Sequence, residues 1–183
     1  MQSIVADTTP LNYLVLIQAT DILLNLYRKA FIPPAVRAEL AHANTPAILR
    51  AWISLPPEWL EVVSLKQPID STLAHLDAGE REAISLASEL QAILLLMDER
   101  DGVTIARQRG LKVVGTLAAL DLAAARGLVD LQTMFDRLRA TTFRCCFLSS
   151  GLGSVQVAVI ALPANDNWQS LPIALSWFRN PHG

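Results

Sequence analysis

The chain has 183 residues, of which 52% are hydrophobic and 17% are charged, and its formal net charge is −2 at pH 7. This length suits one compact α/β domain with a hydrophobic core. No apolar run approaches the roughly 20 residues that a membrane-spanning helix needs. Because the net charge is slightly negative, any binding of nucleic acid cannot depend on an overall positive charge of the protein.

The first half of the chain alternates short strands with helices. Residues 3–6 form an apolar, β-branched run that ends on Asp7, and the Thr8-Thr9-Pro10 segment then supplies a helix cap and a proline suited to a first turn. The further predicted elements are helices at 11–17, 21–27, 35–42 and 46–55, a strand at 30–32 and a short extended segment at 59–65.

The second half continues the alternation. Asp77 and Glu80 form a capping box that opens a helix running through Leu90. The apolar run 93–97 ends on Asp98, and its apolar character on both faces indicates a central parallel strand. The remaining predicted elements are helices at 99–109, 117–126 and 131–139 and a strand at 112–114. We therefore expect a three-layer α/β/α fold with a central parallel sheet.

The composition changes after Arg144, where Asp166 and Arg179 are the only acidic or basic side chains apart from one histidine. We expect a folded domain over residues 1–144 and an apolar C-terminal extension over residues 145–183, with a strand-like segment at 155–162. A frame-shifted or fused end and a partner-binding segment both account for this extension.

The N-terminus and the cysteines predict residence in the cytoplasm. Residues 1–5 contain neither a basic leader nor a long apolar segment, unlike a secretion signal. Cys145 and Cys146 are adjacent, and neighbouring cysteines rarely form a disulfide because its geometry is strained. The pair fits a reducing compartment and argues against a zinc site.

Four carboxylates are candidates for a site, and two of them follow the carboxyl ends of predicted strands, where a parallel sheet binds ligands. Asp7 and Asp98 each end a predicted strand. Glu39 lies in the helix after the second strand, and Glu80 lies in the first turn of the helix that precedes the Asp98 strand. If the fold brings them together, their oxygen atoms favour Mg²⁺ or Mn²⁺, which lower the pKa of bound water and orient a phosphodiester.

Each carboxylate also has a purely structural interpretation. Asp7 can end a strand before a capped helix, and Glu39 suits a solvated helix face near the N-terminus. Glu80 can serve only as the second half of a capping box, and Asp98 can cap the next helix together with Asp101. Taken singly, these residues do not distinguish a site from ordinary helix ends.

Their order and setting resemble a PIN domain over roughly residues 3–143. The segments that carry the resemblance are Val5–Leu11, Pro33–Leu40, Leu76–Ile84, Leu94–Arg100 and Val114–Leu117. More narrowly, they resemble the predicted nucleic-acid-binding PIN proteins allied to VapC-type toxins. This resemblance implies an Mg²⁺- or Mn²⁺-dependent endoribonuclease, commonly the toxin of a type II toxin–antitoxin pair, that forms a homodimer and is blocked by an antitoxin protein.

The resemblance assigns the metal-binding and catalytic roles to Asp7, Glu39, Glu80 and Asp98. For the third acid, Glu82 and Asp77 are the alternatives, and Glu80 is preferred because its separation from Asp98 matches the spacing usual in the family.

Four further residues are accessory candidates. Thr8 resembles the small hydroxyl residue that holds the first aspartate, and it also fits a helix cap. Asp101 is an accessory ligand candidate, as is Glu82 in place of Glu80. Thr116 can touch phosphate or cap a helix. Three arginines either contact RNA on its way to the site or lie on a solvated helix face. They are Arg100, Arg107 and Arg109.

Two other functions stay open. A PIN-like module that binds RNA or a protein without cutting is compatible with glutamate, rather than aspartate, as the third acid. A phosphoacceptor receiver domain shares the parallel α/β fold, but receivers resemble one another in having two adjacent acids after the first strand and a lysine after the last. This chain has Ala6-Asp7-Thr8 and Val114-Gly115-Thr116 there. No base-reading motif identifies a particular RNA.

Overall fold

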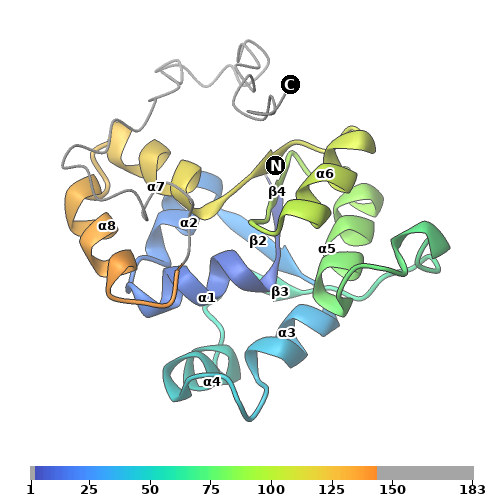
Figure 1. Cartoon of the computed structure of the whole chain (residues 1–183), viewed down its shortest axis with the longest axis horizontal. Helices are drawn as coiled ribbons and strands as arrows, with labels where there is room; N and C mark the ends of the chain where they lie inside the picture. The colour runs from blue at the N-terminus through green and yellow to red at the C-terminus, as the bar shows by residue number, and fades with distance from the viewer. Residues whose placement is uncertain (1–2, 144–183) are drawn as a thin grey trace, which may run out of the picture. The chain divides into compact units, whose positions relative to one another are not determined.

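The computed structural model describes residues 3–143, and the predicted extension over residues 145–183 lies outside the described residues. Strands and helices alternate along the described part (Figure 1). The strands are β1 (Ser3–Ala6), β2 (Lys29–Ile32), β3 (Leu60–Val62), β4 (Leu94–Leu96) and β5 (Val113–Val114). The helices are α1 (Thr8–Leu16), α2 (Asp21–Tyr27), α3 (Pro34–Leu40), α4 (Ala47–Ser54), α5 (Ala78–Glu89), α6 (Arg100–Gln108), α7 (Thr116–Ala125) and α8 (Leu131–Arg139), with a 3-10 helix, η1, over Ser71–Leu73.

The five strands form one parallel sheet in the order β3-β2-β1-β4-β5. In the central strand, Val5 is paired with Phe31 of β2 and with Leu95 of β4. The chain first builds outward from β1 to β2 and β3, and then returns to the other side of β1 with β4 and β5. The strand order therefore reverses between β1 and β4, and ligands bind at the carboxyl ends of strands at such a reversal.

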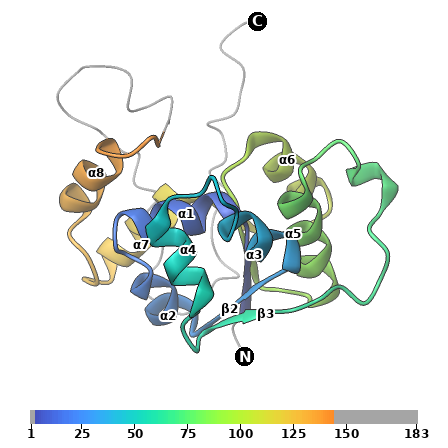
Figure 2. The same cartoon turned by 90° about the horizontal axis from the view of Figure 1, so that it is seen from below.

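Helices cover both faces of the sheet (Figure 2). On one face α5 contacts β1 and β4, and α6 contacts β5. On the other face α1 and α2 both contact α7, which in turn contacts α8. The predicted three-layer α/β/α fold is confirmed. In the part of the chain that the structure describes, no helix combines the length and apolar character needed to cross a membrane.

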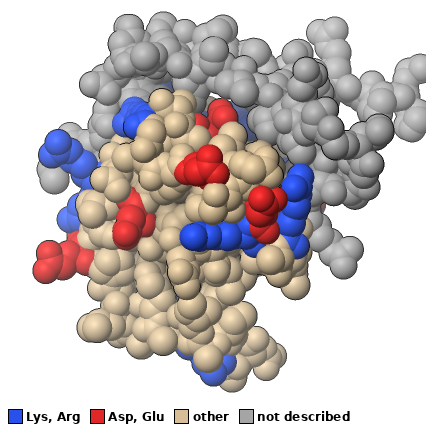
Figure 3. Space-filling model, turned by 90° about the vertical axis from the view of Figure 1, so that its left-hand side faces the viewer, with Lys and Arg blue, Asp and Glu red and all other residues tan. Residues whose placement is uncertain are grey.

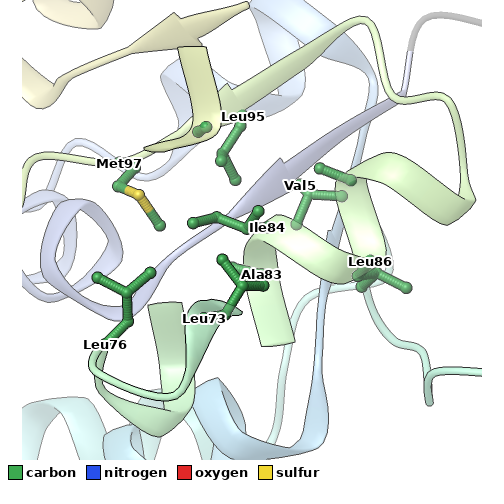
Figure 4. Packing of buried hydrophobic residues seen from close by; sticks show 10 residues of the cluster. Val5, Leu73, Leu76, Ala83, Ile84, Leu86, Leu95 and Met97 are labelled. Carbon is green, nitrogen blue, oxygen red and sulfur yellow. The ribbon is translucent and has the colours of Figure 1, made fainter. Parts of the chain in front are cut away.

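Burial on both faces of the sheet accounts for the uninterrupted apolar strands. Val5 and Leu95 lie side by side and pack against Ile84 of α5 (Figure 4). Successive strand residues point to opposite faces, so Ile4 and Leu96, both fully buried, point to the face covered by α1, α2 and α7. The sheet is thereby fixed as a rigid support for the residues that follow β1 and β4.

The predicted helices and strands are found close to their expected positions, with two differences at their ends. Asp7 is the N-cap residue of α1, so it is the single residue that separates β1 from α1. Glu99 is the N-cap residue of α6, and the capping role considered for Asp98 is therefore wrong. The 3-10 helix η1 was not expected, because three residues are too few to show a helical period.

Candidate functional site

Asp7 lies at the carboxyl end of β1, where its backbone N–H donates a hydrogen bond of 2.9 Å to the carbonyl oxygen of Leu96. Only 2% of the residue is exposed. Burial raises the pKa of its carboxyl group from 3.8 to about 7, and the negative charges of Glu80 and Glu39 raise it further, whereas the backbone N–H of Thr8 lowers it. Asp7 is thus a buried carboxyl group facing two other acids.

Glu39 is held between two helices other than its own. The Thr8 hydroxyl on α1 donates to Glu39 Oε2, and the backbone N–H of Gly79 on α5 donates to Oε1 at 2.8 Å. The hydroxyl expected to hold Asp7 therefore holds Glu39 instead. The interpretation of Glu39 as a solvated helix residue is wrong, because the side chain is half-buried and both its oxygens accept hydrogen bonds.

Glu80 combines a capping role with a place beside Asp7. Its Oε2 accepts a hydrogen bond of 3.1 Å from the backbone N–H of Asp77, which confirms the predicted capping box of α5. Glu80 is 8% exposed, and burial raises its pKa, as do the charges of Asp77, Glu99 and Asp101. One side chain therefore both caps α5 and acts electrostatically on Asp7.

Asp98 follows β4 and is bound to the start of α7. Its Oδ1 accepts a hydrogen bond of 2.8 Å from the backbone N–H of Thr116, and its Oδ2 accepts one of 2.5 Å from the Thr116 hydroxyl. Burial raises the pKa of Asp98, although both Thr116 hydrogen bonds lower it. Thr116 is the first residue of α7 and is fully buried, so it orients Asp98.

Of the charged candidates around the four acids, one acts on a site acid and two bind elsewhere. Asp101 lies in the first turn of α6 and acts electrostatically on Glu80. Glu82 is turned toward α3, where its Oε2 accepts a hydrogen bond of 2.9 Å from the backbone N–H of Ala35. Arg109 forms an exposed ion pair of 2.7 Å with Asp70. Of these, Asp101 alone is coupled to one of the four predicted site acids.

The acids share one edge of the sheet but do not form a ready-made metal cage. Among residues 3–143, no three histidine, cysteine, aspartate or glutamate side chains are grouped so that they could hold a metal ion. Asp7 is coupled to Glu39 and Glu80, whereas the hydrogen bonds of Asp98 go to α7. Metal binding would therefore require some of these side chains to turn.

The chemistry of the donor set nevertheless fits a hard divalent cation. All the candidate ligand atoms are carboxylate oxygens, which Mg²⁺ and Mn²⁺ prefer. The ion pairs formed among the described residues include none of the four site acids; they are Lys29–Glu61, Asp70–Arg109 and Asp136–Arg139. A cation would therefore supply a positive charge that no ion pair among residues 3–143 provides to these acids.

The surface of the described part of the chain carries both acidic and basic side chains. Figure 3 shows one face, on which basic side chains form a short strip with acidic side chains directly against it. Elsewhere on this face, acidic and basic side chains are scattered over uncharged surface. This distribution agrees with the net charge of −2 and provides no general electrostatic attraction for a polyanion on this face.

Sequence analysis missed the backbone donor Gly79, which holds Glu39 from a position 40 residues away. One signal was available. Glycine is a poor helix former, and Gly79 stands in the first turn of α5 directly before a site acid. Its pairing with Glu39 depends on the contact between α3 and α5, which no local pattern reveals.

Comparisons with known proteins address the family and the fold. The family model DUF3368, described as a PIN domain, matches residues 3–147. A comparison with curated protein sequences finds no match.

Two solved structures show similar folds. One is a PilT N-terminus domain protein from the hyperthermophilic archaeon Sulfolobus solfataricus P2, with 16% identity, a TM-score of 0.46 and coverage of 78% of this chain and 99% of the other. The other is the PIN domain endonuclease Utp24, with 12% identity, a TM-score of 0.47 and coverage of 62% of this chain and 84% of the other. Because the family model spans most of the chain, and the acids that carried the resemblance stand at the expected edge of a parallel sheet, this protein belongs to the PIN-domain family.

Proposed function

We propose that this protein is an Mg²⁺- or Mn²⁺-dependent endoribonuclease whose metal-binding and catalytic residues are Asp7, Glu39, Glu80 and Asp98. The observation that carries the proposal is Asp7, a carboxyl group that is 2% exposed and whose pKa is raised by burial and by the charges of two other acids. Such an arrangement costs folding energy without a cation and is typical of functional sites. PIN domains are generally nucleases that use divalent metal ions.

The role of the protein side chains is to hold oxygen ligands at one edge of the sheet. β1 presents Asp7, the Thr8 hydroxyl and the Gly79 N–H hold Glu39, and Thr116 holds Asp98. When bound, a divalent ion activates water and neutralises charge on the attacking and leaving oxygens of a phosphodiester. We assign the third position to Glu80, because Glu82 is bonded to the start of α3.

We further propose a biological setting, which the resemblance of the motifs supports. In this setting the protein is a VapC-like toxin of a type II toxin–antitoxin pair, acts in the cytoplasm as a homodimer and is inhibited by an antitoxin protein. A small reading frame for a DNA-binding protein directly upstream of the gene is the expected genomic context. Isolation of the protein in complex with the product of that frame would test the pairing.

A second candidate function is a PIN-like module that binds RNA or a protein without cutting. The observation that favours it is the lack, among residues 3–143, of a group of acids already placed to hold a metal ion. This candidate and the nuclease differ in what a divalent ion does. In the module it leaves an RNA substrate intact, whereas in the nuclease it starts cleavage.

The test is cleavage of end-labelled RNA by the full chain with a chelator, with Mg²⁺ and with Mn²⁺. We expect cleavage only with an added ion, and we expect Asp7→Asn and Asp98→Asn each to abolish it. The matched control is Asp136→Asn, an exposed aspartate on α8 paired with Arg139, which should cleave like the unaltered protein. Undiminished cleavage in both site variants would overturn the proposed site, and intact RNA bound in the presence of either ion would favour the module.

A further inference from the structure

Two glycines at helix starts have no backbone reason to be glycine. Gly79 is the second residue of α5 and Gly115 is the N-cap residue of α7. The glycines with positive φ in the described part are Gly110 and Gly127 instead. Glycine in a helix is less favourable than alanine by about 1 kcal/mol, so the glycine at position 79 needs another explanation.

At Gly79 the explanation is the space taken by Glu39. A β-carbon at this position would lie 2.5 Å from Glu39 Oε2 and 2.9 Å from Glu39 Cδ. These distances are shorter than any normal contact, so alanine and the present position of the carboxylate exclude each other. The same carboxylate accepts hydrogen bonds from the Gly79 N–H and the Thr8 hydroxyl, which fix it against the backbone of α5.

Gly115 stands in the same relation to Asp98. A β-carbon there would lie 2.6 Å from Asp98 Oδ1, the oxygen that accepts the hydrogen bond from the Thr116 N–H. Two of the four site acids, which come from different parts of the chain, are therefore seated directly on the backbone at the start of a helix. A carboxylate is stabilised there by the free N–H groups and by the helix dipole.

We propose that Gly79 and Gly115 are positioning residues that let Glu39 and Asp98 rest on helix starts, and so keep both acids at the edge of the sheet where the metal ion binds. This inference rests on the proposed function, since it concerns two proposed metal ligands. An added methyl group would push the flexible end of the acid away and break its hydrogen bonds, while the helix itself would be maintained. Loss of such supporting interactions typically weakens metal binding by 10–100-fold.

The experiment is a double-mutant cycle read out by Mn²⁺ affinity, which does not depend on cleavage. The full-length protein is compared with Gly79→Ala, Glu39→Ala and the double variant by calorimetric titration with Mn²⁺, and folding is checked by circular dichroism. We expect Gly79→Ala alone to weaken Mn²⁺ binding by about 10–100-fold. In the Glu39→Ala background it should have no further effect, because no carboxylate remains to be displaced.

Two further arms strengthen the test. Ala78→Ser enlarges an exposed neighbour in the same turn of α5 and should leave Mn²⁺ affinity unchanged. Gly115→Ala should weaken Mn²⁺ binding in the unaltered background but not in an Asp98→Ala background.

The outcomes separate the positioning role from the proposed function. If Glu39→Ala weakens Mn²⁺ binding and Gly79→Ala does not, the positioning role is overturned and the proposed site stands. If Gly79→Ala weakens binding equally with and without Glu39, the glycine does not act through that acid and the inference is again wrong. Failure of the unaltered protein to bind Mn²⁺ would overturn the proposed metal site and the positioning role together.

Discussion

At the scale of single residues, the dominant feature is a carboxyl group buried where it cannot ionise freely. The pKa of Asp7 is raised to about 7, chiefly by burial and then by Glu80 and Glu39. In the unfolded chain this group ionises near 3.8, so between these two values the folded protein binds more protons than the unfolded chain. Stability must therefore fall as the pH rises through this interval.

This linkage predicts that Asp7→Asn stabilises the metal-free protein at neutral pH. With a chelator present, we expect the free energy of unfolding of the unaltered protein to fall between pH 4 and pH 8 by on the order of 3 kcal/mol more than that of the variant. Urea unfolding at several pH values measures the difference. Parallel pH dependences for the two proteins would show that Asp7 ionises normally in the folded state.

The sequence could predict where in the fold the four proposed site acids lie, but not the groups that donate hydrogen bonds to Glu39. Asp7 and Asp98 follow short strands in a recognisable setting, and the capping box of Glu80 is a local pattern. The partners of Glu39 are 31 and 40 residues away, at Thr8 and Gly79, and depend on the contacts among three helices. Local patterns contain no information about such pairings, which explains why the Thr8 hydroxyl was expected to hold the wrong acid.

At the scale of elements, α5 connects the core with the candidate site. One face of the helix packs on β1 and β4 through residues such as Ile84, and its first turn provides Gly79 and Glu80 to the site. Its Glu82 accepts a hydrogen bond from Ala35 and so joins it to the start of α3. The helix was predictable because its period and capping box agree, whereas η1 is too short to show a period.

The position of Glu82 predicts a structural role. Glu82→Ala should reduce the free energy of unfolding by about 1 kcal/mol, the usual effect of losing a side chain that satisfies an N–H group at a helix start. Mn²⁺ affinity should remain as in the unaltered protein. The control is Glu58→Ala, at an exposed position before β3, which should change neither quantity. A marked loss of Mn²⁺ affinity in Glu82→Ala would assign the third acid to Glu82 instead.

At the scale of the whole molecule, the described body contains a complete sheet with both faces covered. Leu95 belongs to the buried cluster on the α5 side and is 1% exposed. We expect Leu95→Ala to lower the free energy of unfolding by about 2–5 kcal/mol, because it leaves a cavity in the core. Chemical denaturation measures this, and Leu55→Ala, at a position 85% exposed, should cost far less. Similar costs for both variants would contradict the proposed core.

The domain limits expected from the sequence lead to a second prediction at this scale. A chain that ends at Arg144 retains all five strands and the helices that cover them. We expect this shortened chain to unfold in a single cooperative transition in urea, with the far-ultraviolet circular dichroism of an α/β protein. A gradual, non-cooperative transition would show that residues 145–183 are needed for folding.

The reversal of strand order between β1 and β4 has a consequence for the timing of synthesis. Within the domain, Asp7 is made more than 70 residues before Glu80, the acid that acts on it electrostatically, and the groups that donate hydrogen bonds to Asp98 come only with Thr116. Chains emerge from the ribosome in sequence order and fold as enough of a domain becomes available. A nascent or prematurely terminated chain that stops before α7 therefore lacks the groups that hold Asp98, so the acidic edge is assembled only when the domain is nearly complete.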